Sequence, residues 1–186
     1  MNRKHAEQFE IQTVETQKGF RKTAVYRGKY YSAAVPAEKL ARYKAALKGA
    51  SLVMALLFVG MGLMNNDGSK IFYVILPYAI LSLSVFFMLV SSITFGKTKE
   101  KLTVPEYDKT VGRIKTAVIA AFISATAGAI GSLIYILSGQ SSTPGWEIIF
   151  LAGYVAIAAC AFLSLQIHKN IQYEQTDEKV HESTEK

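Results

Sequence analysis

Side chains able to do acid, base or metal chemistry are few and widely separated in this 186-residue chain. The histidines are His5, His168 and His181, and Cys160 is the single cysteine, inside an apolar run. A metal site needs several ligands at close spacing, and a cysteine nucleophile needs a nearby base. The sequence has no such grouping, no Ser–His–Asp set and no phosphate-binding glycine loop. We therefore expect no catalytic residue, no metal and no cofactor, and predict that the protein is not an enzyme.

Basic side chains are the more abundant functional groups. Lys and Arg number 21 against 14 Asp and Glu, a formal net charge of +7. Interleaved with aromatic residues, they suit an anionic lipid leaflet, at about 1 kcal/mol for each well-placed base. The alternatives are that these charges only set membrane topology or that they bind nucleic acid. Because no nucleic-acid motif occurs, we expect no nucleic-acid partner. The candidate anionic-lipid contacts are Arg21, Lys22, Arg27, Lys29, Arg42, Lys44, Arg113 and Lys115.

Long apolar runs must position these groups. Stretches of 18, 26, 31 and 20 residues without Asp, Glu, Lys or Arg cover 49–66, 71–96, 116–146 and 148–167. A bilayer core about 30 Å thick is crossed by about 20 helical residues. Four buried helices of a soluble protein would need polar outer faces, which these runs lack. We predict an all-α membrane protein, an antiparallel four-helix transmembrane bundle with spans at about 45–64, 71–95, 116–138 and 147–167.

The distribution of positive charge predicts the orientation. All but one of the 21 Lys and Arg lie before the first span, between the second and third, or after the fourth, and the exception is Lys70. By the positive-inside rule, both termini are cytoplasmic. The predicted organisation is a basic cytoplasmic segment at 1–44, a membrane domain at 45–168 and an acidic, disordered cytoplasmic tail at 169–186.

Two cytoplasmic features complete this organisation. The stretches 9–16 and 22–35 favour strand, with a turn at 17–19 between them, so a short β-hairpin is predicted near the N-terminus. A similar sequence motif, the repeated phrase, also occurs twice, as VPAEKLARYKAAL from Val35 and as VPEYDKTVGRIKTAV from Val104. Each copy precedes an apolar run, and proline suits a helix start. The repeat indicates either a duplicated helical hairpin or convergence of two similar entries into the membrane.

Small residues recur at four-residue spacing in the third and fourth spans, which lets helix backbones approach closely. Packing between these two spans is the expected use, and a homo-oligomer contact or a groove for a partner helix is the alternative. The candidate interface residues are Ala117, Ala121, Ser124, Ala125, Gly128, Ala129 and Ser132 in span three and Ala152, Ala156, Cys160 and Ser164 in span four. Pro77 is expected to kink the second span.

The motifs YRGKYY, RYK, YVILPY and PEYDK together resemble a family of small, uncharacterised bacterial four-span membrane proteins. The resemblance covers the chain from Tyr26 to the end of the fourth span. It implies a bacterial cytoplasmic-membrane protein and brings no activity, cofactor or catalytic residue.

Two hypotheses for the function follow. The first is a non-enzymatic accessory or scaffold subunit that associates with another membrane protein or with itself, beside an anionic inner leaflet. The alternative is an oligomeric transporter or channel for small solutes. In that case the serines of span two would line the path, namely Ser82, Ser84, Ser91 and Ser92.

Overall fold

Four long helices dominate the computed structural model, which describes residues 9–16, 19–26 and 28–176, with side chains from residue 28 onward. They are α1 (Ala37–Gly62), α2 (Phe72–Gly96), α4 (Arg113–Leu137) and α5 (Pro144–Asn170). All four are long and apolar enough to cross a membrane. The prediction of a mainly helical chain with four candidate spans is therefore confirmed.

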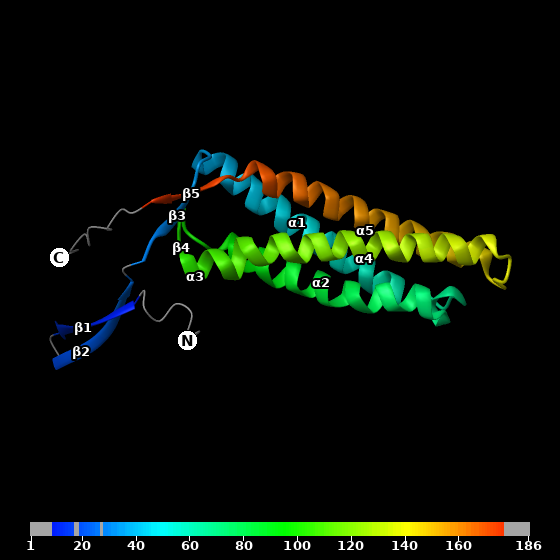
Figure 1. The fold of residues 1–186 in the computed structure, drawn as a ribbon, viewed down its shortest axis with the longest axis horizontal. Helices are drawn as coiled ribbons and strands as arrows, with labels where there is room; N and C mark the ends of the chain where they lie inside the picture. Colours follow the sequence, from blue (N-terminus) through cyan, green and yellow to red (C-terminus); the bar gives the residue numbers. More distant parts are fainter. Residues whose placement is uncertain (1–8, 17–18, 27, 177–186) are drawn as a thin grey trace.

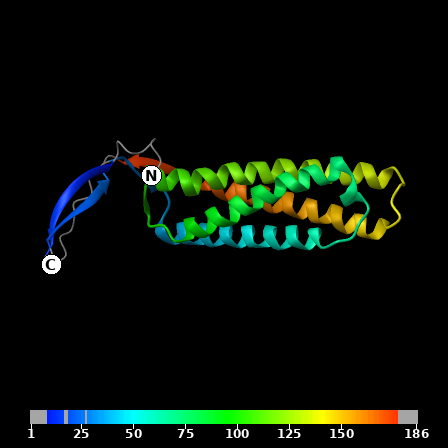
Figure 2. The ribbon, with the colours of Figure 1, turned by 90° about the horizontal axis from the view of Figure 1, so that it is seen from below.

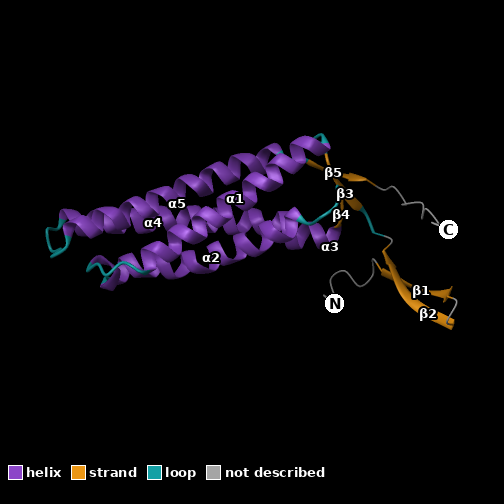
Figure 3. Ribbon diagram, turned by 180° about the vertical axis from the view of Figure 1, so that it is seen from behind, coloured by secondary structure: helices purple, strands orange, loops and turns teal. Residues whose placement is uncertain are grey.

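The remaining elements are short. They are β1 (Phe9–Thr16), β2 (Gly19–Tyr26), β3 (Tyr30–Ala33), η2 (Gly68–Lys70), β4 (Lys101–Thr103), α3 (Val104–Tyr107), η3 (Asp108–Gly112) and β5 (Tyr173–Thr176). Strands β3, β4 and β5 gather at one end of the long helices, and the turns after α1 and α4 lie at the other end (Figures 1 and 3).

The long helices pack around one apolar core. α1 and α4 each contact both α2 and α5, and all four run close to parallel in a second view (Figure 2). In α1 the core side chains recur every seven residues: Leu40, Leu47, Met54 and Met61. α2 repeats this spacing with Val74, Leu81, Met88 and Phe95. A seven-residue repeat is typical of helices that pack along a narrow, left-handed seam.

The predicted N-terminal hairpin is present, but its second strand ends earlier than predicted. β1 and β2 pair antiparallel from Phe9 opposite Tyr26 to Thr16 opposite Gly19. Within the predicted strand 22–35, Tyr30–Ala33 forms the separate β3, which pairs antiparallel with β4 and β5. The strand is divided because β3 finds partners about 70 and 140 residues further along the chain. The predicted turn residues 17 and 18 lie outside the described residues.

The predicted disordered tail begins in ordered structure. α5 continues to Asn170, and Tyr173–Thr176 forms β5, where Gln175 Nε2 donates a 2.6 Å hydrogen bond to the Tyr31 hydroxyl. The Tyr107 ring stacks on Tyr31, with centroids 4.1 Å apart, and meets the Tyr173 ring edge-on. Burial raises the pKa of Tyr173. Disorder was therefore the wrong prediction for 173–176, and residues 177–186 lie outside the described part.

Both copies of the repeated phrase start a helix, as their prolines predict. Pro36 directly precedes α1, and Pro105 is in the first turn of α3, whose N-cap Thr103 forms a capping box with Glu106. The second copy has two more residues between its proline and its arginine. Its extra length coincides with η3, a π-helical turn that links α3 to α4. A π-turn holds more residues per turn than an α-helix, so it absorbs an insertion without ending the helix.

Candidate functional site

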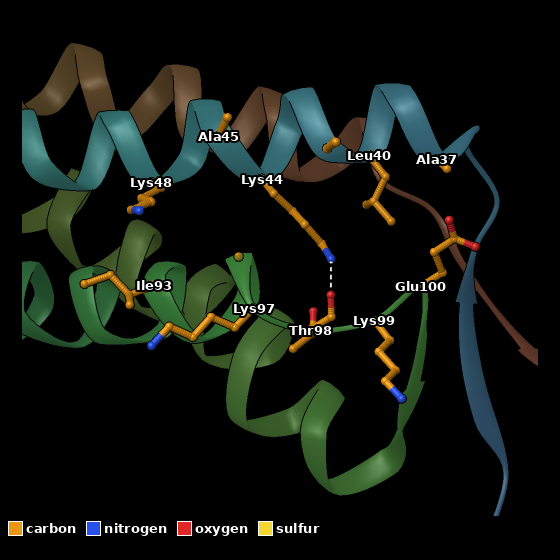
Figure 4. Close-up of a pocket in the computed structure, with 12 residues that line it drawn as sticks. Ala37, Leu40, Lys44, Ala45, Lys48, Ile93, Lys97, Thr98, Lys99 and Glu100 are labelled. Atoms are coloured by element: carbon orange, nitrogen blue, oxygen red, sulfur yellow. Dashed lines mark hydrogen bonds between the residues drawn. The ribbon is translucent and has the colours of Figure 1, made fainter. Parts of the chain in front are cut away.

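A basic cleft opens at the β-sheet end of the helices, between α1 and the end of α2 (Figure 4). It has a volume of about 480 Å³, within the range of about 300–1,000 Å³ of small-molecule sites. Its lining residues are Ala37, Leu40, Ala41, Lys44, Ala45, Lys48, Ile93, Gly96, Lys97, Thr98, Lys99 and Glu100. The basic cleft therefore has largely apolar walls, four lysine amines and one carboxylate.

Lys44 fixes the geometry of the basic cleft. Its Nζ donates a 2.8 Å hydrogen bond to the Thr98 carbonyl and lies 5.1 Å from the centroid of the Phe95 ring. Thr98 follows the last turn of α2, where backbone carbonyls lack amide partners and the helix dipole is negative. The Thr98 hydroxyl donates to the Phe95 carbonyl at 2.8 Å, which completes this helix end. Lys44, a predicted lipid contact, is thus also a tie between α1 and α2.

The other amines of the basic cleft are exposed. Lys48 lies on the side of α1 that faces α2, Lys97 runs along α2 toward Ile93, and Lys99 points away from α1 (Figure 4). Among the residues the structure describes, none of these three lysines forms an ion pair. Uncompensated amines beside apolar surface are suited to bind the phosphate of an amphiphile.

The other predicted lipid contacts do not converge on the basic cleft. Arg42 forms an exposed 2.6 Å ion pair with Glu38, and Lys115 is exposed on α4. Arg113 lies over the Phe87 ring at 5.8 Å, beside an apolar groove of about 330 Å³ between α2 and α4. Lys29 is exposed just before β3. Of the remaining three, Arg21 and Lys22 lie in β2, where only the backbone is described, and Arg27 lies outside the described residues.

The small residues of α4 face inward. Ala117, Ala121, Ser124, Ala125, Gly128 and Ser132 are buried, and Ala129 is half-buried. Gly128 receives the Tyr154 ring of α5, whose hydroxyl donates a 2.9 Å hydrogen bond to the Val74 carbonyl of α2. On α5 the small residues become more exposed toward the start of the helix. Ser164 is buried, Ala156 and Cys160 are half-buried, and Ala152 is exposed. The α4 row therefore packs within the chain, and the α5 row lies at the edge of the core.

Three of the four predicted path-lining serines of α2 are buried inside the bundle, and Ser82 is partly exposed. Ser84, Ser91 and Ser92 are buried, and Ser82 donates a 2.6 Å hydrogen bond to the Ala79 carbonyl. The centre of the bundle is filled by large apolar side chains, among them Met54, Leu81, Met88 and Ile157, which are fully buried. The three buried serines therefore pack within the chain. Pro77 lies inside α2, which continues through it as one helix.

A buried carboxylate, Glu147, lies at the opposite end of the bundle and is not among the predicted site residues. Glu147 is 1% exposed, and its Oε2 and Oε1 accept 2.8 Å hydrogen bonds from Asn66 Nδ2 and the Gly68 amide. Nearby, a hydrogen bond donated by Ser142 lowers the pKa of Asp67. These hydrogen bonds connect the turn after α1 with the turn after α4 and the start of α5. A helix-breaking NND stretch followed by a distant Glu in a first helical turn was the only available signal.

Comparison with family models, with curated proteins and with solved structures gives no match for this chain. Among the described residues, no group of three or more His, Cys, Asp or Glu could hold a metal ion. The basic cleft is therefore interpreted from its own chemistry.

Proposed function

We propose that the protein is a multi-pass protein of a bacterial cytoplasmic membrane, with both termini on the cytoplasmic side, and that it works as a non-enzymatic accessory or scaffold subunit. In this arrangement the four helices form an antiparallel transmembrane bundle. The β-sheet and the basic cleft face the anionic inner leaflet, where lysine and arginine are favoured.

The exposed face of α1 is the observation that carries the accessory role. Only 22% of its apolar 18-residue window is buried, against 28% for α5, 33% for α2 and 44% for the helix Val104–Leu137. Leu52, Leu56 and Leu63 on this face are 53%, 65% and 82% exposed. At Gly49 and Gly60 an added Cβ would meet nothing within 4 Å. A helix with a wide free face and small residues offers close approach to a partner helix.

The test is the composition of the complex extracted from the native host in mild detergent. A tagged full-length chain should bring down a second membrane protein in fixed stoichiometry. The double change Leu52→Ala/Leu56→Ala on α1 should reduce the amount of that partner. Leu83→Ala/Phe86→Ala, a matched pair of exposed positions on α2, should leave it unchanged. A homo-oligomer without a second protein would contradict the accessory role and favour a pore built between subunits.

A further inference from the structure

The basic cleft has the composition of a lipid headgroup site. We propose that it binds a phospholipid whose headgroup carries two negative charges, with phosphates on the amines and an acyl chain against the apolar wall. This inference rests on the proposed function, because it assumes that the basic cleft faces the inner leaflet. It adds a lipid ligand for the cleft. It does not depend on the identity of a partner protein.

Charge selects the headgroup. The Lys99 amine points away from α1 (Figure 4), which leaves Lys44, Lys48, Lys97 and Glu100 to define the charge inside the basic cleft. Three amines and one carboxylate have two net positive charges. Lys44 is held by the Thr98 carbonyl, whereas Lys48 and Lys97 have no ion-pair partner among the described residues. A headgroup with two negative charges would neutralise the cleft.

Depth selects a lipid over a soluble phosphate. α1 has 26 residues, about 39 Å of helix, so about six residues at its N-terminal end extend beyond a hydrocarbon core about 30 Å thick. Lys44 then lies at the boundary between headgroups and hydrocarbon, and Lys48 lies one turn deeper, from where its long side chain can extend back to the headgroups. The apolar lining includes Leu40, Ala45 and Ile93. Ile93 is 38% exposed, and Val90, about one turn earlier on α2, is 39% exposed. An acyl chain can therefore leave the cleft along α2, whereas a soluble phosphate would leave this apolar wall uncovered.

The experiment measures lipid binding by the full-length protein in detergent, by native mass spectrometry. Diphosphatidylglycerol, phosphatidylglycerol and phosphatidylcholine are added at equal concentrations. We expect diphosphatidylglycerol to bind most tightly. Lys48→Gln/Lys97→Gln should weaken it about 30-fold, since each base contributes about 1 kcal/mol. Lys39→Gln/Lys109→Gln, which removes the same charge from exposed positions outside the basic cleft, should have no such effect. Lys48→Arg/Lys97→Arg should retain binding.

Three results would overturn the proposal. Equal losses in the cleft variant and in the control variant would show diffuse electrostatic attraction without a site. Equal affinity for the three lipids would remove the headgroup assignment. Displacement of diphosphatidylglycerol by millimolar glycerol 3-phosphate would identify a site for soluble phosphates. The thermal unfolding midpoint of each variant, measured in the same detergent, separates loss of binding from loss of fold. A partner protein that persists while lipid binding fails would leave the accessory role standing.

Discussion

Ser32 and Lys101 stand opposite each other in the β3–β4 ladder, and each is three residues before the valine of a repeated Val-Pro phrase. An antiparallel pair has a local two-fold axis, and here that axis exchanges equivalent positions of the two copies. The same exchange relates α1 to α4 and α2 to α5, which agrees with the observed helix contacts. If the two Val-Pro segments had become similar by convergence, nothing would favour pairing of the strands at equivalent positions. The pairing therefore favours duplication of a strand–helix hairpin.

This register predicts a disulfide. In a Cys160→Ala background, Ser32→Cys/Lys101→Cys should form an intrachain bond on mild oxidation. Directly opposed Cβ atoms lie about 4.5–5.5 Å apart in an antiparallel pair, close to the span of a disulfide. Proteolysis between the two positions should then leave the fragments linked until reduction. Ser32→Cys/Thr103→Cys, displaced by two residues on the same strand, should link far less; equal linking would contradict the register.

Glycine positions on the helices should respond in opposite directions to alanine. At Gly128 an added Cβ would overlap the Tyr154 ring, so Gly128→Ala must displace a buried side chain. We expect a loss of about 1–3 kcal/mol in the free energy of unfolding. At Gly60 an added Cβ meets nothing within 4 Å. Gly60→Ala should therefore stabilise α1 by about 0.5–1 kcal/mol.

Thermal unfolding in one detergent, followed by circular dichroism, compares the two variants. A midpoint that falls for Gly128→Ala and rises slightly for Gly60→Ala supports the observed contact between α4 and α5. Equal midpoints would indicate that Tyr154 does not pack on Gly128.

The four helices were predictable because span length and apolar composition are local properties of the sequence. The basic cleft and the buried Glu147 could not be predicted, because both are formed by contacts between residues far apart in the sequence. Lys44 was recognised as a base, but its role at the end of α2 requires the two helices to meet. Lys97 directly follows α2, and only the meeting of α1 and α2 brings it into the basic cleft. The burial of Glu147 could not be predicted because its partners, Asn66 and Gly68, are about 80 residues away.

The proposed orientation predicts which cysteines react from outside the cell. In the Cys160→Ala background, Gln140→Cys lies in the exposed turn between α4 and α5, and Lys169→Cys lies near the end of α5. A membrane-impermeant maleimide should label Gln140→Cys in intact cells and should label Lys169→Cys only after permeabilisation. The reverse pattern would place the basic cleft at the outer leaflet and contradict the positive-inside assignment.

The buried Glu147 carboxylate should stabilise the outer turns. Glu147→Ala would leave the Asn66 amide and the Gly68 N–H without their acceptor, at about 1–3 kcal/mol for each buried donor. Glu147→Gln should be much milder, because the Gln carbonyl can still accept from Gly68. The Asn66 amide can also turn so that its Oδ1, which has no partner in the structure, accepts from the new Gln amide.

Glu38→Ala is the matched control, since Glu38 also lies in the first turn of a long helix but is exposed and paired only with Arg42. Surface ion pairs contribute about 0–1 kcal/mol, so this change should be nearly silent. The fluorescence of Trp146, the single tryptophan and the neighbour of Glu147, reports unfolding at this end. A midpoint that is lowered strongly by Glu147→Ala, slightly by Glu147→Gln and hardly by Glu38→Ala would establish the buried acceptor. Equal effects of the two Glu→Ala changes would mean that Glu147 acts only through the helix dipole.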